Sequence, residues 1–193
     1  MTHTFRVILT LLAFTFPTFS QAQKADKNEA TEKLGMAIDY FTAGKYHEAL
    51  LIFSRLDKEF KLNPRFHAYM GVCQYYEWNF PEATKLLSEA IPLLGGLAPH
   101  ERSVYYYACA ESFFNQEKYA EAIPYYEQHL NVCYDNEKGD SLYRIAFCHL
   151  FGEDEATACE YFESSLAYYE QYNSSATARI AQLKNMINGL KSN

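Results

Sequence analysis

The chain has 193 residues, with 17 Lys and Arg, 24 Asp and Glu, and a formal net charge of −7. Its hydrophobic fraction of 49% excludes a wholly disordered polymer, and its 8 Gly and 6 Pro are too few for a collagen-like or linker-rich chain. The negative balance argues against a nucleic-acid partner, because a phosphate backbone must be met by clustered Lys and Arg.

Residues 1–22 are predicted to be a cleavable signal peptide. Arg6 precedes an apolar run from Val7 to Phe19, and Ser20 and Ala22 place small residues at the −3 and −1 positions of a cut after Ala22. The run has 13 residues, whereas about 20 are needed to span a bilayer, so we expect no stable membrane insertion after cleavage. The mature chain is therefore expected in the periplasm or outside the cell.

Four short blocks recur along the rest of the chain. They end in alanines spaced by 34, 39 and 36 residues, and each alanine is followed four residues later by a bulky residue. A second small residue precedes each alanine by 12 positions. The alanines are Ala49, Ala83, Ala122 and Ala158, the bulky residues are Phe53, Leu87, Tyr126 and Phe162, and the earlier small residues are Ala37, Gly71, Ala110 and Ala146.

This pattern resembles the tetratricopeptide repeat (TPR), in which two amphipathic helices form each unit of about 34 residues. The resemblance predicts an all-α solenoid over residues 23–172, with units at 30–63, 64–102, 103–138 and 139–172. The fourth unit matches more weakly, and the tryptophan of the family signature is replaced in all four. The five surplus residues of the second interval coincide with 95–100, where we expect an extended loop. Residues 173–193 read as a helix that caps the last unit.

The resemblance also implies a concave face lined by the first helix of each unit. The family's groove positions fall on a set of apolar and aromatic residues: Phe41, Val72, Tyr75, Tyr76, Tyr107, Glu111, Phe114, Tyr143 and Phe147. We therefore expect a non-catalytic scaffold of the cell envelope that holds a protein or peptide in an aromatic groove. Core packing is the competing interpretation for most of these side chains. A carbohydrate or peptidoglycan binder and a thiol-dependent accessory protein are the alternative functions, and the oligomeric state stays open.

Cysteines and histidines give no clear chemical site in the sequence. The five cysteines are interpreted either as small buried hydrophobes or as containing one disulfide, with Cys148–Cys159 as the first candidate and Cys73–Cys109 as the second. His67 and His100 are interpreted as isolated, His129 as lacking a second ligand four residues on, and His149 beside Cys148 as a weak zinc pair. The familiar metalloprotease, hydrolase and phosphate-loop motifs are missing from the sequence. We therefore predict no catalytic residue, no metal site and no cofactor.

Overall fold

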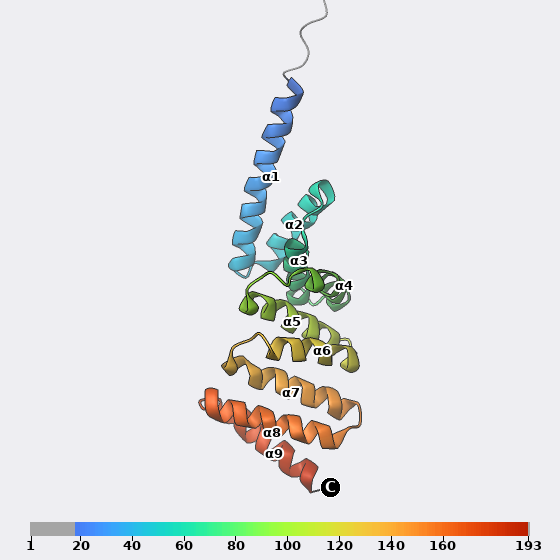
Figure 1. Ribbon diagram of the computed structural model, residues 1–193, viewed down its shortest axis with the longest axis vertical. Coiled ribbons are helices and arrows are strands. Elements are labelled where there is room, and N and C mark those ends of the chain that lie inside the picture. The colour runs from blue at the N-terminus through green and yellow to red at the C-terminus, as the bar shows by residue number, and fades with distance from the viewer. Residues whose placement is uncertain (1–17, 193) are drawn as a thin grey trace, which may run out of the picture.

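A computed structural model describes residues 18–192, with side chains from residue 27 onward. In this part of the chain the structure is helical throughout, and no strand is present. The helices are α1 (Thr18–Thr42), α2 (Tyr46–Phe60), α3 (Pro64–Tyr76), α4 (Phe80–Ala90), the 3₁₀ helix η1 (Ile91–Leu93), α5 (Pro99–Phe114), α6 (Tyr119–Leu130), α7 (Asp135–Phe151), α8 (Glu155–Tyr172) and α9 (Thr177–Lys191). Each packs against the next in chain order, and the N-terminal part of α1 projects beyond the stack (Figure 1). The predicted solenoid of four helix pairs is confirmed.

The recurring small and bulky residues lie where the paired helices pack. All four alanines that end the repeated blocks are fully buried, and so are the four bulky residues that follow them. The earlier small residues are buried as well, and Gly71 shows why they must be small. A Cβ atom on Gly71 would lie 2.6 Å from Cγ of Leu87, which is closer than two carbon atoms can approach. Small residues therefore allow the two helices of a unit to approach at their crossing, and large ones fill the space beside it.

The turn between the two helices has the same geometry in all four units. Its left-handed residue has φ between 60° and 72° and is Gly44, Trp78, Glu117 or Glu153. The next backbone N–H then donates to a carbonyl five residues earlier, as from Lys45 to Tyr40 at 2.9 Å. The equivalent bonds at the other three turns measure 2.9–3.1 Å. The fourth unit thus repeats the turn of the first three, although its sequence matches the repeat less closely.

Some boundaries differ from those read in the sequence. Helix α5 begins at Pro99 and α7 at Asp135, both ahead of the unit boundaries at 103 and 139. Part of the expected loop at 95–100 is therefore the first turn of α5, and η1 takes up residues just before it.

The N-terminal segment carries the untested predictions. Most of the proposed signal peptide falls on residues 1–17, which lie outside the described residues. Helix α1 begins at Thr18, so a cut after Ala22 would remove its first turn without reaching residues 30–63, which form the first unit. Among the described helices, none combines the length and the apolar character that a bilayer crossing requires.

Helix α9 covers the end of the array. Leu183 and Ile187 of α9 are buried in one cluster with Phe162 and Tyr169 of α8. The predicted capping helix is therefore present, and it removes the apolar face of the fourth unit from water.

All five cysteines are free thiols in this structure, so neither candidate disulfide is formed in it. Cys148 packs in the cluster between α6 and α7, whereas Cys159 packs in the cluster on the α9 side of the fourth unit. The two thiols thus belong to different packing layers, although their helices are adjacent. Cys73 and Cys109 are likewise buried in separate clusters, as small apolar side chains.

Candidate functional site

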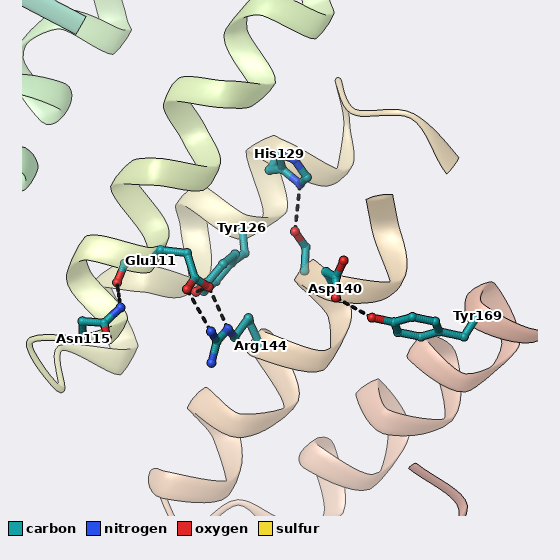
Figure 2. A network of polar contacts seen from close by, with 8 residues as sticks. Glu111, Asn115, Tyr126, His129, Asp140, Arg144 and Tyr169 are labelled. Carbon is teal, nitrogen blue, oxygen red and sulfur yellow. Dashed lines mark hydrogen bonds and ion pairs between the residues drawn. The ribbon is translucent and has the colours of Figure 1, made fainter. Parts of the chain in front are cut away.

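A buried carboxylate joins α5, α6 and α7. Glu111 is only 3% exposed, and its Oε1 accepts a hydrogen bond of 2.5 Å from the Tyr126 hydroxyl. Arg144 of α7 forms a two-pronged ion pair with it, at 2.7 Å from Nε to Oε1 and 2.9 Å from Nη2 to Oε2. Figure 2 shows these three side chains converging from their three helices. A buried charge is tolerated when it is paired and hydrogen-bonded in this way.

The network shifts the ionisation of both partners of Glu111. Burial lowers the pKa of the Arg144 guanidinium, but the neighbouring Glu111 carboxylate offsets this, and the net pKa is raised. Burial also raises the pKa of Tyr126 far above its ordinary value, with Glu111 adding to the effect. Arg144 is therefore a cation and Tyr126 a neutral hydrogen-bond donor at physiological pH.

A pocket lies beside this network, on the face formed by α5, α7 and the capping helix α9. Its volume is about 390 Å³, and its lining residues come from α5, α7 and α9: Tyr107, Asp140, Tyr143, Arg144 and Arg179. Arg179 lies over the Tyr143 ring with its guanidinium carbon 4.0 Å from the centroid. Asp140 accepts a hydrogen bond from the Tyr169 hydroxyl (Figure 2). The lining thus combines tyrosines with three charged groups.

Two positive groups of this pocket are available to a ligand. Arg144 uses Nε and Nη2 for Glu111, and its Nη1 has no partner among the described residues. Arg179 makes one long hydrogen bond, 3.4 Å to Gln182, and no ion pair within the described part of the chain. The pocket can therefore donate hydrogen bonds to an acidic or carbonyl group while tyrosine rings supply apolar contact.

The predicted groove residues divide into four groups. Tyr107 and Tyr143 line the pocket, although Tyr143 is only 8% exposed. Val72 and Glu111 were expected on the groove surface, but both are buried, Val72 in the apolar core and Glu111 beneath Arg144. Tyr76 is half exposed and stacks on Tyr46 with 4.0 Å between ring centroids.

The remaining predicted residues mostly support other side chains. Phe41 stacks on Tyr69 at 4.5 Å, and Phe147 meets Phe162 edge-on at 5.3 Å. Tyr75 packs partly against the core cluster of α3 to α5, and Phe114 lies under the Arg144 guanidinium at 4.7 Å. The described pocket is consequently more polar than the predicted aromatic groove, because these four rings pack within the array.

A second cluster of polar side chains lies at the C-terminal end of α6, one turn beyond Tyr126. His129, Cys133 and Glu137 bring one nitrogen, one sulfur and one carboxylate oxygen within 4.8 Å of one another. His129 is buried, which lowers its pKa to about 4, and its Nδ1 lies 2.8 Å from the Ser141 hydroxyl oxygen. Cys133 and Glu137 are partly exposed. This cluster departs from the expectation that His129 lacks a second ligand four residues on.

Sequence reasoning missed the charged residues of the pocket and the second cluster. Asp140 and Arg144 stand four residues apart on α7, and Arg144 directly follows the predicted Tyr143, so a polar stripe was visible there. Cys133 stands four residues after His129, and Glu137 four residues after Cys133. That spacing was the available signal, but it crosses the end of a helix, where periodicity does not predict proximity.

Comparisons with known proteins identify the fold. No family model matches the chain, and no curated protein sequence matches it. Among solved structures, MamA from Desulfovibrio magneticus is 18% identical with a TM-score of 0.61, covering 77% of this chain and 80% of that one. A kinesin light chain from Podospora anserina with TPR-like repeats is 13% identical, with a TM-score of 0.60 and 85% of each chain covered. The N-terminal domain of stress-induced protein-1 from C. elegans is 18% identical, with a TM-score of 0.53, 66% of this chain and 94% of that domain.

The chain therefore has the tetratricopeptide-repeat fold. At these identities the likeness establishes the architecture, and the function must be argued from the surface of this chain.

Proposed function

We propose that the protein is a non-catalytic scaffold that binds a segment of a partner polypeptide on the face formed by α5, α7 and α9. The observation that carries this proposal is the pocket of about 390 Å³ in which Tyr107, Tyr143, Arg144 and Arg179 converge. Tyrosine and arginine are the residue types that dominate protein–protein contacts, since they combine contact area with hydrogen bonding. A repeat array supplies a rigid, extended surface on which such a pocket can hold a chain.

The chemistry of the pocket selects the partner segment. Glu111 pairs with Arg144, so Arg179 is the one of the two pocket arginines that has no ion pair among the described residues. We infer that the bound segment places an acidic side chain between Arg179 and Nη1 of Arg144, with an apolar or aromatic neighbour against Tyr107. Burying a guanidinium–carboxylate pair at the centre of such a contact favours specificity over nonspecific adhesion.

The location is a further part of the proposal. The signal-like residues 1–22 support export, and the mature protein would then begin at Gln23 in the periplasm or outside the cell. Amino-terminal sequencing of the protein recovered from its native cell tests this. Recovery with Met1 intact would contradict export through a cleaved signal.

A thiol-dependent role, in contrast, is disfavoured by the structure. A reactive cysteine needs a lowered pKa, so that the thiolate forms at neutral pH. Burial instead raises the pKa of Cys148 to about 12. The thiol of Cys148 is accordingly a packing group.

A charge reversal in the pocket tests the proposed function. Arg179→Glu places a negative charge where the acidic group of the partner would bind, and Arg55→Glu makes the same change on an exposed position of α2. Tagged wild-type and variant proteins are purified from the native cell, and the proteins that they retain are quantified by mass spectrometry. We expect a partner that is retained by the wild type and by Arg55→Glu but lost from Arg179→Glu. Equal retention by both variants would refute the pocket as the binding site.

A further inference from the structure

The second polar cluster lies at the turn between α6 and α7. His129 belongs to the last turn of α6, Cys133 to the connecting turn, and Glu137 to the first turn of α7. The backbone N–H of Cys133 donates to the His129 carbonyl at 2.9 Å. This hydrogen bond extends the last helical turn of α6 and keeps Cys133 beside His129. Three different donor types are therefore held in one place by backbone geometry.

Two of the three side chains are oriented before any ligand binds. The Ser141 hydroxyl oxygen lies 2.8 Å from Nδ1 of His129, while Nε2 has no hydrogen bond to another described residue. Oε2 of Glu137 accepts the backbone N–H of Tyr134 at 2.9 Å in a capping box. Hydrogen bonds of this kind fix the direction of metal ligands in proteins and strengthen binding.

The cluster is open to solvent on one side, and a fourth donor stands there. Cys133 and Glu137 are partly exposed, so an ion can enter. His100, in the first turn of α5, has its Nδ1 3.9 Å from Oε2 of Glu137, and its ring stacks on Tyr134 with 4.2 Å between centroids.

We propose that His129, Cys133 and Glu137 form a zinc-binding site that clamps the turn between α6 and α7. Imidazole nitrogen, thiolate sulfur and carboxylate oxygen are the ligands of Zn²⁺, whereas Mg²⁺ and Ca²⁺ take oxygen alone. Tetrahedral zinc places its ligand atoms about 3.3–3.8 Å apart, given bonds of about 2.0–2.3 Å. The three donor atoms, within 4.8 Å of one another, reach that geometry by side-chain movements of about 1 Å. On binding, the Cys133 thiol releases its proton to solvent as the Zn–S bond forms.

Cobalt spectroscopy tests the site directly. The protein lacking residues 1–22 is treated with a chelator, and Co²⁺ is added as a probe that takes the same ligands as zinc. We expect a thiolate-to-cobalt charge-transfer band in the near ultraviolet for the wild type, which Zn²⁺ then abolishes by displacing Co²⁺. Cys133→Ser should lose the band, whereas Cys159→Ser, a partly exposed cysteine on α8, should keep it.

Two further variants separate ligand loss from misfolding. Glu137→Gln keeps an oxygen for the capping box but is a poorer ligand, and Ser141→Ala removes only the support of His129. Both should bind Zn²⁺ about 10–100-fold more weakly in a chelator competition while keeping wild-type helicity by circular dichroism. Absence of the cobalt band from the wild type, or unchanged zinc affinity in Cys133→Ser, would overturn the proposal.

Discussion

Removing Arg144 should reveal how much the buried Glu111 depends on its partner. Arg144→Leu preserves most of the side-chain volume but deletes both bonds to the carboxylate, at 2.7 and 2.9 Å. Glu111 would keep the Tyr126 hydroxyl as its donor and would otherwise be an unpaired charge at 3% exposure. Breaking a buried ion pair on one side costs about 3–5 kcal/mol. The Arg144 side chain is 34% exposed, so solvent screens part of the ion pair. We therefore expect Arg144→Leu to lower the free energy of unfolding by about 2–4 kcal/mol.

A second substitution should rescue the first. Glu111→Gln removes the negative charge but leaves a carbonyl oxygen to accept from Tyr126, so the double variant contains no unpaired buried charge. We expect it to recover about 1–2 kcal/mol relative to Arg144→Leu alone. Alone, Glu111→Gln should cost less than Arg144→Leu, because the partly exposed guanidinium that it leaves behind can bind water.

Urea unfolding followed by circular dichroism measures these differences as shifts in midpoint at constant slope. For a chain of this length, a cost of 2–4 kcal/mol lowers the melting temperature by roughly 4–16 °C. Arg55→Leu, on an exposed position of α2, is the matched control and should change the free energy of unfolding by no more than about 0.5 kcal/mol. If Arg144→Leu costs no more than this control, or if Glu111→Gln fails to rescue it, the buried pair does not hold α5 and α7 together.

Three further substitutions and one change of pH test the packing, the turns and the buried Tyr126 hydroxyl. Gly71→Ala should cost about 1–3 kcal/mol because its Cβ would lie 2.6 Å from Leu87, whereas Gly189→Ala, with no atom within 4 Å, should stabilise α9 by about 0.5–1 kcal/mol; equal urea midpoints would contradict this. Glu117→Gly should raise the melting temperature, because glycine adopts this left-handed conformation (φ 60°) without the strain of about 1 kcal/mol that a side chain imposes there, and a lower melting temperature would argue against strain at the turn. Raising the pH above about 10 should lower the free energy of unfolding: Tyr126 stays protonated in the folded chain, where burial raises its pKa, while unfolded phenols ionise near pH 10, and a flat pH profile to strongly alkaline pH would contradict this.

The repeat could be predicted from the sequence because its physical requirement recurs in every unit. Each helix crossing needs a small residue, so Ala49 and Gly71 stand in the same register as their counterparts in the other units. The capping helix was predictable for a related reason, because the last apolar face must be covered. Periodic constraints of this kind leave a periodic trace in one sequence.

The pocket residues leave no such trace. Arg144 pairs with Glu111 across 33 positions of sequence, and this pair has no counterpart at the same positions in the other units. Val72 was predicted on the groove surface from its position in the repeat. In this chain that position is buried in the core cluster of α3 to α5. Features that occur once depend on which side chains meet across helices, and a single sequence does not record that.

Hydrogen bonds and ion pairs connect the first helices of successive units and the capping helix α9. Arg65 of α3 binds Glu101 of α5 through two hydrogen bonds of 2.7 and 3.0 Å, and Glu111 of α5 binds Arg144 of α7 in the same two-pronged manner. Gln182 of α9 continues the series by donating to the Tyr143 hydroxyl at 3.0 Å. The alanines and Gly71 determine how closely the helices of one unit approach, whereas these hydrogen bonds and ion pairs join the first helix of one unit to that of the next. Because planar two-pronged pairs constrain orientation as well as distance, they fix the relative positions of the residues that line the pocket. The same side chains thus stabilise the array and shape the surface that it offers to a partner.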